Sequence, residues 1–186
     1  MSKKFKYIQA IAIILVALIY VGVKNLPSHR GISPGPEKGE FHYVRRVVDG
    51  DTLKMSDNER VRLIGVDTPE MHHSNKLIRD SKNSGKDIKT IQALGARAYE
   101  FTKDLCLHKR VRFEYDVVRR DKYGRLLAYV YLEDGTFVNA KIIEEGYGQI
   151  MTIPPNVKHA DLFKELEKQA REDRKGLWKT GLVDSR

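Results

Sequence analysis

The sequence predicts an α+β fold built on a small β-barrel of five strands. Five short stretches read as strands, with Gly-rich turns between several of them. One amphipathic helix falls between the third and fourth stretches, and further helices follow the fifth. With 186 residues, 41% of them hydrophobic, the chain has enough apolar material for one ordinary domain and a tail.

The five predicted strands lie at residues 41–48, 52–55, 60–66, 110–115 and 126–132. The third is predicted to be unbroken. Because side chains alternate along a strand, Arg62 and Ile64 are expected on one face and Leu63 on the other. Two neighbouring strands of this kind can bring residues near 51 and near 67 together.

About three α-helices are predicted, at residues 90–108, 137–145 and 158–175. The first carries one apolar stripe at helical spacing, formed by Ile91, Leu94, Ala98, Phe101 and Leu105. Residues 71–89 are polar and basic with little periodicity, which predicts an exposed loop. Together these elements predict a barrel of the OB type over residues 41–180, with 181–186 as a C-terminal tail.

The first 23 residues differ from the rest of the chain. Three lysines precede a nearly continuous apolar run from residue 7 to residue 23, the pattern of a signal anchor or a signal peptide. The basic flank favours an orientation with the N-terminus inside and the remainder exported. We favour an uncleaved membrane anchor, with a cleaved signal and a secreted domain as the alternative. Residues 24–40 contain several Pro and Gly and predict a flexible linker.

The chain is basic, with a formal net charge of +9, and residues 24–186 retain a net charge of +6. This excess favours a polyanionic partner, nucleic acid or an anionic membrane surface, although a merely soluble basic surface is a common alternative. The single cysteine, Cys106, excludes an intramolecular disulfide and a Cys-rich zinc site. It lies beside the apolar stripe, which predicts a packed thiol.

Carboxylates and arginines cluster in residues 48–70, within otherwise strand-like sequence. Asp51, Asp67 and Glu70 can meet there, and clustered carboxylates usually need a cation. Oxygen ligands suit a hard cation such as Ca²⁺ or Mg²⁺, and arginine matches phosphate oxygens. This combination suggests phosphodiester chemistry. The alternative is that Asp-Gly-Asp and Asp-Thr-Pro are ordinary turns, and on this stretch alone the two interpretations are about equally good.

Several ordered motifs resemble the staphylococcal nuclease (thermonuclease) family from residue 44 to residue 178. The matching pieces are Val48-Asp49-Gly50-Asp51-Thr52, Arg62 to Glu70 (RLIGVDTPE), Asp121 to Tyr129 (DKYGRLLAY), Val138-Asn139 with Gly146, and the helix end from Gln169 to Trp178. They occur in order and at compatible spacing over about three quarters of the chain. The resemblance implies an OB-fold nuclease.

The resemblance also implies a Ca²⁺ site and its neighbours. Asp51 and Asp67 match the carboxylates that bind Ca²⁺, and the backbone carbonyl of Thr68 matches a third ligand. Asp49 matches an outer-sphere acid, and Glu70 matches the residue that activates the attacking water. The implied reaction is Ca²⁺-dependent cleavage of the P–O5′ bond in DNA and RNA, leaving 3′-phosphates.

The remaining implied roles concern the substrate. Arg62 and Arg125 match two arginines that grip the reacting phosphate, and Lys122 and Tyr123 match contacts to a terminal phosphate. Contacts to the sugar–phosphate backbone of the nucleic acid imply little recognition of its bases. The protein is expected to be a monomer with no protein partner. In place of two tyrosines of the family's type member the chain has Met151 and Ile153, which removes an aromatic stacking platform.

Two rival classes are a non-catalytic nucleic-acid-binding module of the same fold and a purely structural OB barrel. Binding-only modules of this type commonly lack several of the site carboxylates or arginines. All five, Asp51, Arg62, Asp67, Glu70 and Arg125, are present here, which favours catalysis. Taken alone, Arg125 also fits a turn arginine on a solvated edge.

Overall fold

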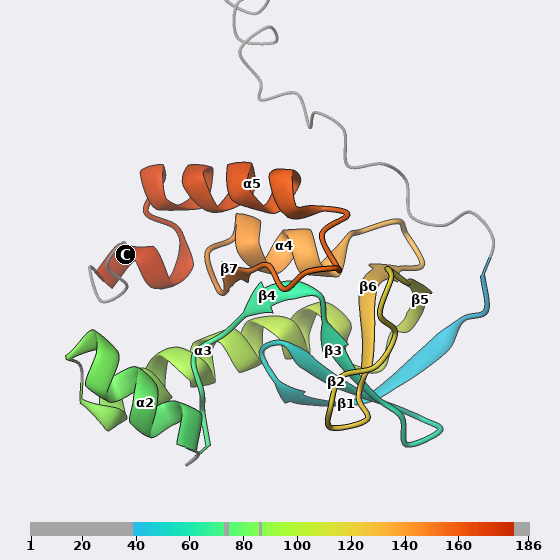
Figure 1. Ribbon diagram of the computed structural model, residues 1–186, viewed down its shortest axis with the longest axis horizontal. Coiled ribbons are helices and arrows are strands. Elements are labelled where there is room, and N and C mark those ends of the chain that lie inside the picture. The colour runs from blue at the N-terminus through green and yellow to red at the C-terminus, as the bar shows by residue number, and fades with distance from the viewer. Residues whose placement is uncertain (1–38, 73–74, 86, 181–186) are drawn as a thin grey trace, which may run out of the picture. The chain divides into compact units, whose positions relative to one another are not determined.

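A closed five-stranded barrel forms the centre of the computed structural model, which describes residues 39–72, 75–85 and 87–180 (Figure 1). The barrel strands are β1 (His42–Asp49), β2 (Thr52–Met55), β3 (Arg60–Leu63), β5 (Arg110–Glu114) and β6 (Leu126–Leu132). They pair in the order β1-β2-β3-β6-β5 and close through β1 and β5, with β3 and β6 parallel and the other pairs antiparallel. The predicted OB-type barrel is confirmed.

The N-terminal anchor predicted at residues 1–23, nearly all of the linker at 24–40 and the tail at 181–186 lie outside the described residues. Within the described ranges, no helix is both long and apolar enough to cross a membrane.

The strand predicted at residues 60–66 is wrong in one respect, because it breaks in two. β3 ends at Leu63, and β4 (Gly65–Asp67) leaves the barrel to pair with β7 (Gln149–Met151). Gly65 has a φ of +79°, a conformation that favours glycine, and Phe163 packs where a Cβ would stand. Strict alternation therefore fails, and Leu63 and Ile64 are both buried.

The exposed loop predicted at residues 71–89 is also wrong, because the segment contains helix α2 (Asn75–Ser84). α2 packs against α3 (Ile88–Cys106), and its Leu77 is fully buried. Only Leu77 and Ile78 of its ten residues are apolar, so the apolar pattern was too sparse to predict a helix from the sequence. The described residues thus hold four α-helices where about three were predicted.

The three predicted helices are confirmed with small shifts at their ends, as α3, α4 (Val138–Glu144) and α5 (Ala160–Glu172). Asp87 caps α3, since its carboxylate accepts from the Thr90 N–H at 3.0 Å. A 3₁₀ helix, η1 (Gly176–Thr180), follows α5. The Cys106 thiol is fully buried, which raises its pKa to about 12, as expected of a packed cysteine.

Asn139 on α4 fixes the bend between β3 and β4. Its side chain is fully buried, accepts from the Val130 N–H at 2.9 Å and donates to the Ile64 carbonyl at 2.8 Å. A buried amide holds its place firmly when its polar atoms are paired. Asn139 therefore joins α4 to β6 and to the residue at which β3 turns away from the barrel.

Candidate active site

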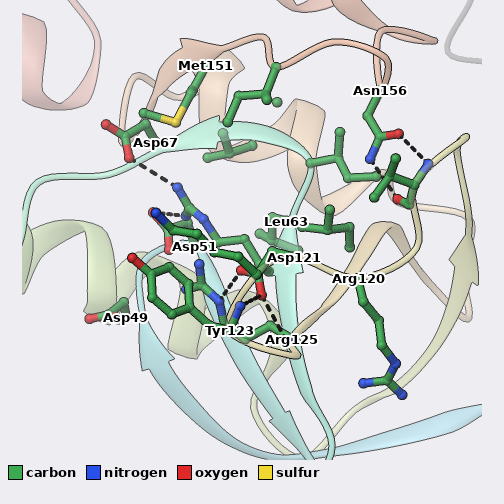
Figure 2. Close-up of a pocket in the computed structure, with 18 of the residues that line it drawn as sticks. Asp49, Asp51, Leu63, Asp67, Arg120, Asp121, Tyr123, Arg125, Met151 and Asn156 are labelled. Carbon is green, nitrogen blue, oxygen red and sulfur yellow. Dashed lines mark hydrogen bonds and ion pairs between the residues drawn. The ribbon is translucent and has the colours of Figure 1, made fainter.

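A cleft of about 650 Å³ opens beside the point where β3 turns into β4. Its walls come from the ends of β1 and β3, from β4, from the turn at residues 121–125 and from residues 151–156 (Figure 2). Every residue predicted for the site except Thr68 lines it: Asp49, Asp51, Arg62, Asp67, Glu70, Lys122, Tyr123 and Arg125. Residues more than 70 positions apart in sequence thus meet in one place.

Asp51 is the most deeply held of the acids. It is 5% exposed, and its Oδ2 accepts from the backbone N–H and the hydroxyl of Thr68, both at 3.1 Å. Thr52 donates its hydroxyl to the other oxygen at 2.9 Å. These contacts fix Asp51 relative to the Asp67–Thr68 segment.

Arg62 lies between two carboxylates. Its guanidinium forms ion pairs with Asp51 Oδ2 and, at 3.1 Å, with Asp67 Oδ1. Burial lowers the pKa of Arg62, and Arg125 lowers it further, while Asp67 and Glu70 oppose this shift. The oxygens of Asp51 and Asp67 therefore converge on one position, and Arg62 and Arg125 are close enough to act on one anion.

Arg125 is aimed by Asp121, a residue to which the sequence alone assigned no role. The Asp121 carboxylate accepts from Arg125 Nε at 2.7 Å, and from the backbone N–H groups of Tyr123 and Arg125 at 2.9 and 3.0 Å. Partial burial by itself raises the pKa of Asp121, but the hydrogen bonds from Arg125 outweigh it and hold the pKa below its ordinary value. The sequence did hold a signal for this role of Asp121. It is an Asp at the start of a tight turn, and Asp in this position commonly accepts hydrogen bonds from the backbone of the turn.

Helix α3 supports the carboxylate side of the cleft. Thr102 donates its hydroxyl to the Gly50 carbonyl at 2.7 Å, which holds the turn before Asp51. Gly95 lies against the backbone that carries Glu70, and a Cβ there would come within 2.6 Å of the Glu70 carbonyl carbon. A glycine inside a predicted helix was the available signal for this close approach.

The rim of the cleft carries the predicted phosphate contacts. Tyr123 is 73% exposed, with Lys122 at 5.1 Å and Arg125 at 5.6 Å from its ring centroid. Met151 and Ile153 also line the cleft. They present apolar side chains where the family's type member has aromatic rings.

Two further arginines reach the cleft wall and were not predicted. Arg79 comes from α2, the helix that was not predicted from the sequence. Arg120 points away from the carboxylate cluster in Figure 2, and donates to Glu59 at 2.7 and 3.0 Å and to the Gly124 carbonyl at 2.7 Å. Arg120 therefore pins the 121–125 turn to the β2–β3 turn.

The donor set suits a hard cation. Asp51 and Asp67 offer converging carboxylate oxygens, and the Thr68 carbonyl follows directly in the chain. Among the described residues, however, no three or more His, Cys, Asp or Glu side chains form a metal-binding group. Any cation held here would therefore depend on the main chain, water or substrate for its remaining ligands.

A cleft on an OB-type barrel that joins Asp51, Asp67 and Glu70 with Arg62 and Arg125 has the groups of a phosphodiester-cleaving enzyme, a hydrolase of the nuclease class. Residues 60–180 match the family model described as "Staphylococcal nuclease homologue". The chain therefore belongs to the staphylococcal nuclease family, as its motifs predicted.

Curated relatives support the same assignment. A thermonuclease of Staphylococcus intermedius is 38% identical over 174 residues, which cover 92% of this chain and 94% of that protein. A thermonuclease of Staphylococcus hyicus is 33% identical, covering 90% and 91%. Endonuclease YncB of Bacillus subtilis (strain 168) is 36% identical, covering 76% and 63%.

Proposed function

We propose that the protein is a Ca²⁺-dependent nuclease that hydrolyses DNA and RNA at the P–O5′ bond and leaves 3′-phosphates. The observation that carries this proposal is the convergence of Asp51, Asp67, Glu70, Arg62 and Arg125 on one cleft. In this reaction water attacks phosphorus, the bond to O5′ breaks, and O5′ takes up a proton from solvent and leaves as a 5′-hydroxyl. Negative charge builds on the phosphate oxygens in the transition state. A monomer suffices, because one chain supplies all five groups.

Each residue takes a role that follows from its chemistry. Asp51, Asp67 and the Thr68 carbonyl would hold the cation, with Asp49 near it. When bound, the cation would add positive charge beside the phosphate. Glu70 orients the attacking water and accepts its proton. Arg62 and Arg125 donate to the phosphate oxygens, and this contact strengthens as charge develops in the transition state.

Arg62 would change its ion-pair partners when the cation and the substrate bind. In the described structure its guanidinium pairs with Asp51 and Asp67. A cation bound to these carboxylates would take over their neutralisation, and Arg62 would then be available to the phosphate. Lys122 and Tyr123 on the rim contact a neighbouring terminal phosphate.

The test is cleavage of single-stranded DNA by the full chain, with Ca²⁺, with Mg²⁺ and with a chelator. Glu70→Gln and Arg62→Ala should each lower kcat by about 10²–10³-fold without loss of the fold. Arg110→Ala is the matched control, because Arg110 is a surface arginine, 57% exposed, that pairs with Glu133 outside the cleft.

Binding of DNA without cleavage under any divalent cation would contradict the proposal and favour the binding-module alternative. Near-wild-type turnover of Glu70→Gln or Arg62→Ala would show that their roles are assigned wrongly. Cleavage with Mg²⁺ but not with Ca²⁺ would contradict the metal assignment alone.

We also propose that residues 7–23 tether the enzyme to the cell membrane, with the domain over residues 41–180 exported. The support is the sequence, a basic flank followed by an apolar run. Alkaline extraction of membranes from cells making the full chain tests this proposal. Release of a protein that lacks residues 1–23 would indicate a cleaved signal and a secreted nuclease instead.

A further inference from the structure

Three cations stand side by side across the barrel surface next to the cleft. Arg46 on β1 pairs in register with Lys54 on β2, and Lys54 pairs with Arg60 on β3. Directly opposite residues of neighbouring strands project from the same face, with Cβ atoms about 4.5–5.5 Å apart. We call Arg46, Lys54 and Arg60 the cationic row.

The row faces solvent. Arg46 and Arg60 are exposed and Lys54 is partly exposed, whereas the next residues along, Val47, Leu53 and Val61, are buried in the barrel. No carboxylate among the described residues forms a salt bridge with any member of the row. The neighbouring acid Glu59 pairs with Arg120 at 2.7 Å instead.

The row continues the active-site face of the sheet. Two residues further along β2 and β3, Thr52 pairs in register with Arg62. On β1 the step is three residues, because the register shifts between Val47 and Asp49, and Asp49 is the partner of Thr52 there. Arg62 and Asp49 line the cleft, and Arg60 lies on the same side of β3 as Arg62, two residues or about 6.6 Å away. An anionic chain bound at Arg62 would therefore pass directly onto the row.

Three like charges placed directly opposite one another repel and cost stability. A bound polyanion removes this repulsion. Its binding is favoured further because each neutralised phosphate releases counterions. Continuity with the cleft points to the occupant, since a nucleic acid chain already lies there under the proposed function.

We propose that the cationic row binds the sugar–phosphate backbone of the nucleic acid outside the cleft, next to the phosphate that is cut. This inference rests on the proposed function and extends it: the row serves long chains and has no part in the chemistry. It sets affinity for polymeric substrates and carries no base specificity, because its contacts go to phosphates.

The test compares two substrates in the full-length enzyme with Ca²⁺: long single-stranded DNA and a nucleoside p-nitrophenyl phosphodiester, which has one phosphodiester. In the variant Arg46→Gln/Lys54→Gln/Arg60→Gln, kcat and KM for the small ester should stay unchanged, which also shows that the fold is intact. KM for the DNA should rise about tenfold. The slope of log affinity against log salt should become shallower by about 2, because each phosphate that is no longer neutralised accounts for about 0.7 of this slope.

The matched control is Lys164→Gln/Lys168→Gln/Lys179→Gln, which removes three exposed cations from α5 and η1. α5 packs on α4 and β7, and lies on the opposite side of the barrel from β1 and β2 in Figure 1. This control should keep the wild-type KM and salt slope. Equal effects of the two triple variants would overturn the proposal, because net charge alone would then explain them.

Failure of the proposed function gives a different result. If the wild-type enzyme cleaves neither substrate, equilibrium binding to the same DNA still tests the row, and an unchanged salt slope in the row variant would overturn the inference. Wild-type DNA binding by the row variant, with loss of its salt-sensitive binding to phosphatidylglycerol vesicles, would also overturn it and assign the row to a lipid surface.

Discussion

At the scale of single residues, Asp121 decides where Arg125 points. It holds the arginine side chain and two backbone N–H groups of the same turn, so the phosphate-binding group stands on a fixed base. Arg62 has no such dedicated partner, because the carboxylates that hold it are the proposed metal ligands. The two arginines are therefore positioned by different means.

Replacing Asp121 with Ala should lower kcat about tenfold or more, because Arg125 loses its orientation while its charge remains. As a positioning residue, Asp121 should affect kcat more than KM, and Asp121→Asn should recover part of the loss by keeping the turn acceptor. Steady-state kinetics on single-stranded DNA measures both. Asp134→Ala is the control, since Asp134 accepts the Thr136 N–H at 2.9 Å in the turn after β6, and neither residue lines the cleft. Equal losses in the two variants would refute the positioning role.

At the scale of elements, α2 adds a wall to the cleft. The helix packs on α3 through its buried face and brings Arg79 to the cavity that holds Glu70. Arg79→Ala should therefore raise KM for DNA several-fold and leave kcat nearly unchanged, because a phosphate contact away from the reacting atoms supports binding. Lys82→Ala is the matched control, as Lys82 is exposed on the same helix and does not line the cleft. A loss in kcat with KM unchanged would contradict this role.

The elements also show what the sequence predicts and where prediction stops. The barrel strands and the long helix follow from local patterns, and the motif residues of the site follow from the family resemblance. The break at Gly65 does not, because the residues that contact this bend, Phe163 and Asn139, lie more than seventy residues later in the chain. Nor does α2, because it has only two apolar residues, Leu77 and Ile78, and the α3 surface on which it packs is not evident from its own sequence.

At the scale of the whole molecule, the site depends on packing between distant parts of the chain. α3 supports the carboxylates through Gly50 and Gly95, and α4 holds the β3–β4 bend through Asn139. The wall at residues 151–156 is held in turn by Asn156, which exchanges two hydrogen bonds of 2.8 Å with the backbone of Val118. Removing any of these interactions should loosen the cleft before the barrel itself unfolds.

The junction between the barrel and the start of α5 makes the stability of the domain dependent on pH. Glu114 on β5 accepts from the Tyr131 hydroxyl at 2.7 Å, contacts His159 at 3.0 Å and pairs with Lys158. Asp116 accepts from the Lys158 N–H and the Tyr129 hydroxyl, both at 3.0 Å. Burial by itself raises the pKa of each acid, but these hydrogen bonds outweigh it and leave both pKa values below their ordinary range.

A carboxyl whose pKa is lower in the folded state contributes stability above its unfolded pKa, and this contribution is lost as the pH falls through the folded value. With unfolded values of about 4.3 for Glu and about 3.9 for Asp, the free energy of unfolding should decline as the pH falls below about 4.5. Glu114→Gln should make this decline shallower. The slope of the unfolding free energy against pH, measured by urea unfolding between about pH 5 and pH 3, should fall by the equivalent of up to about one bound proton. The control is Glu133→Gln, whose side chain is 53% exposed. A decline in Glu114→Gln as steep as in the wild type would show that Glu114 does not drive the acid sensitivity of this junction.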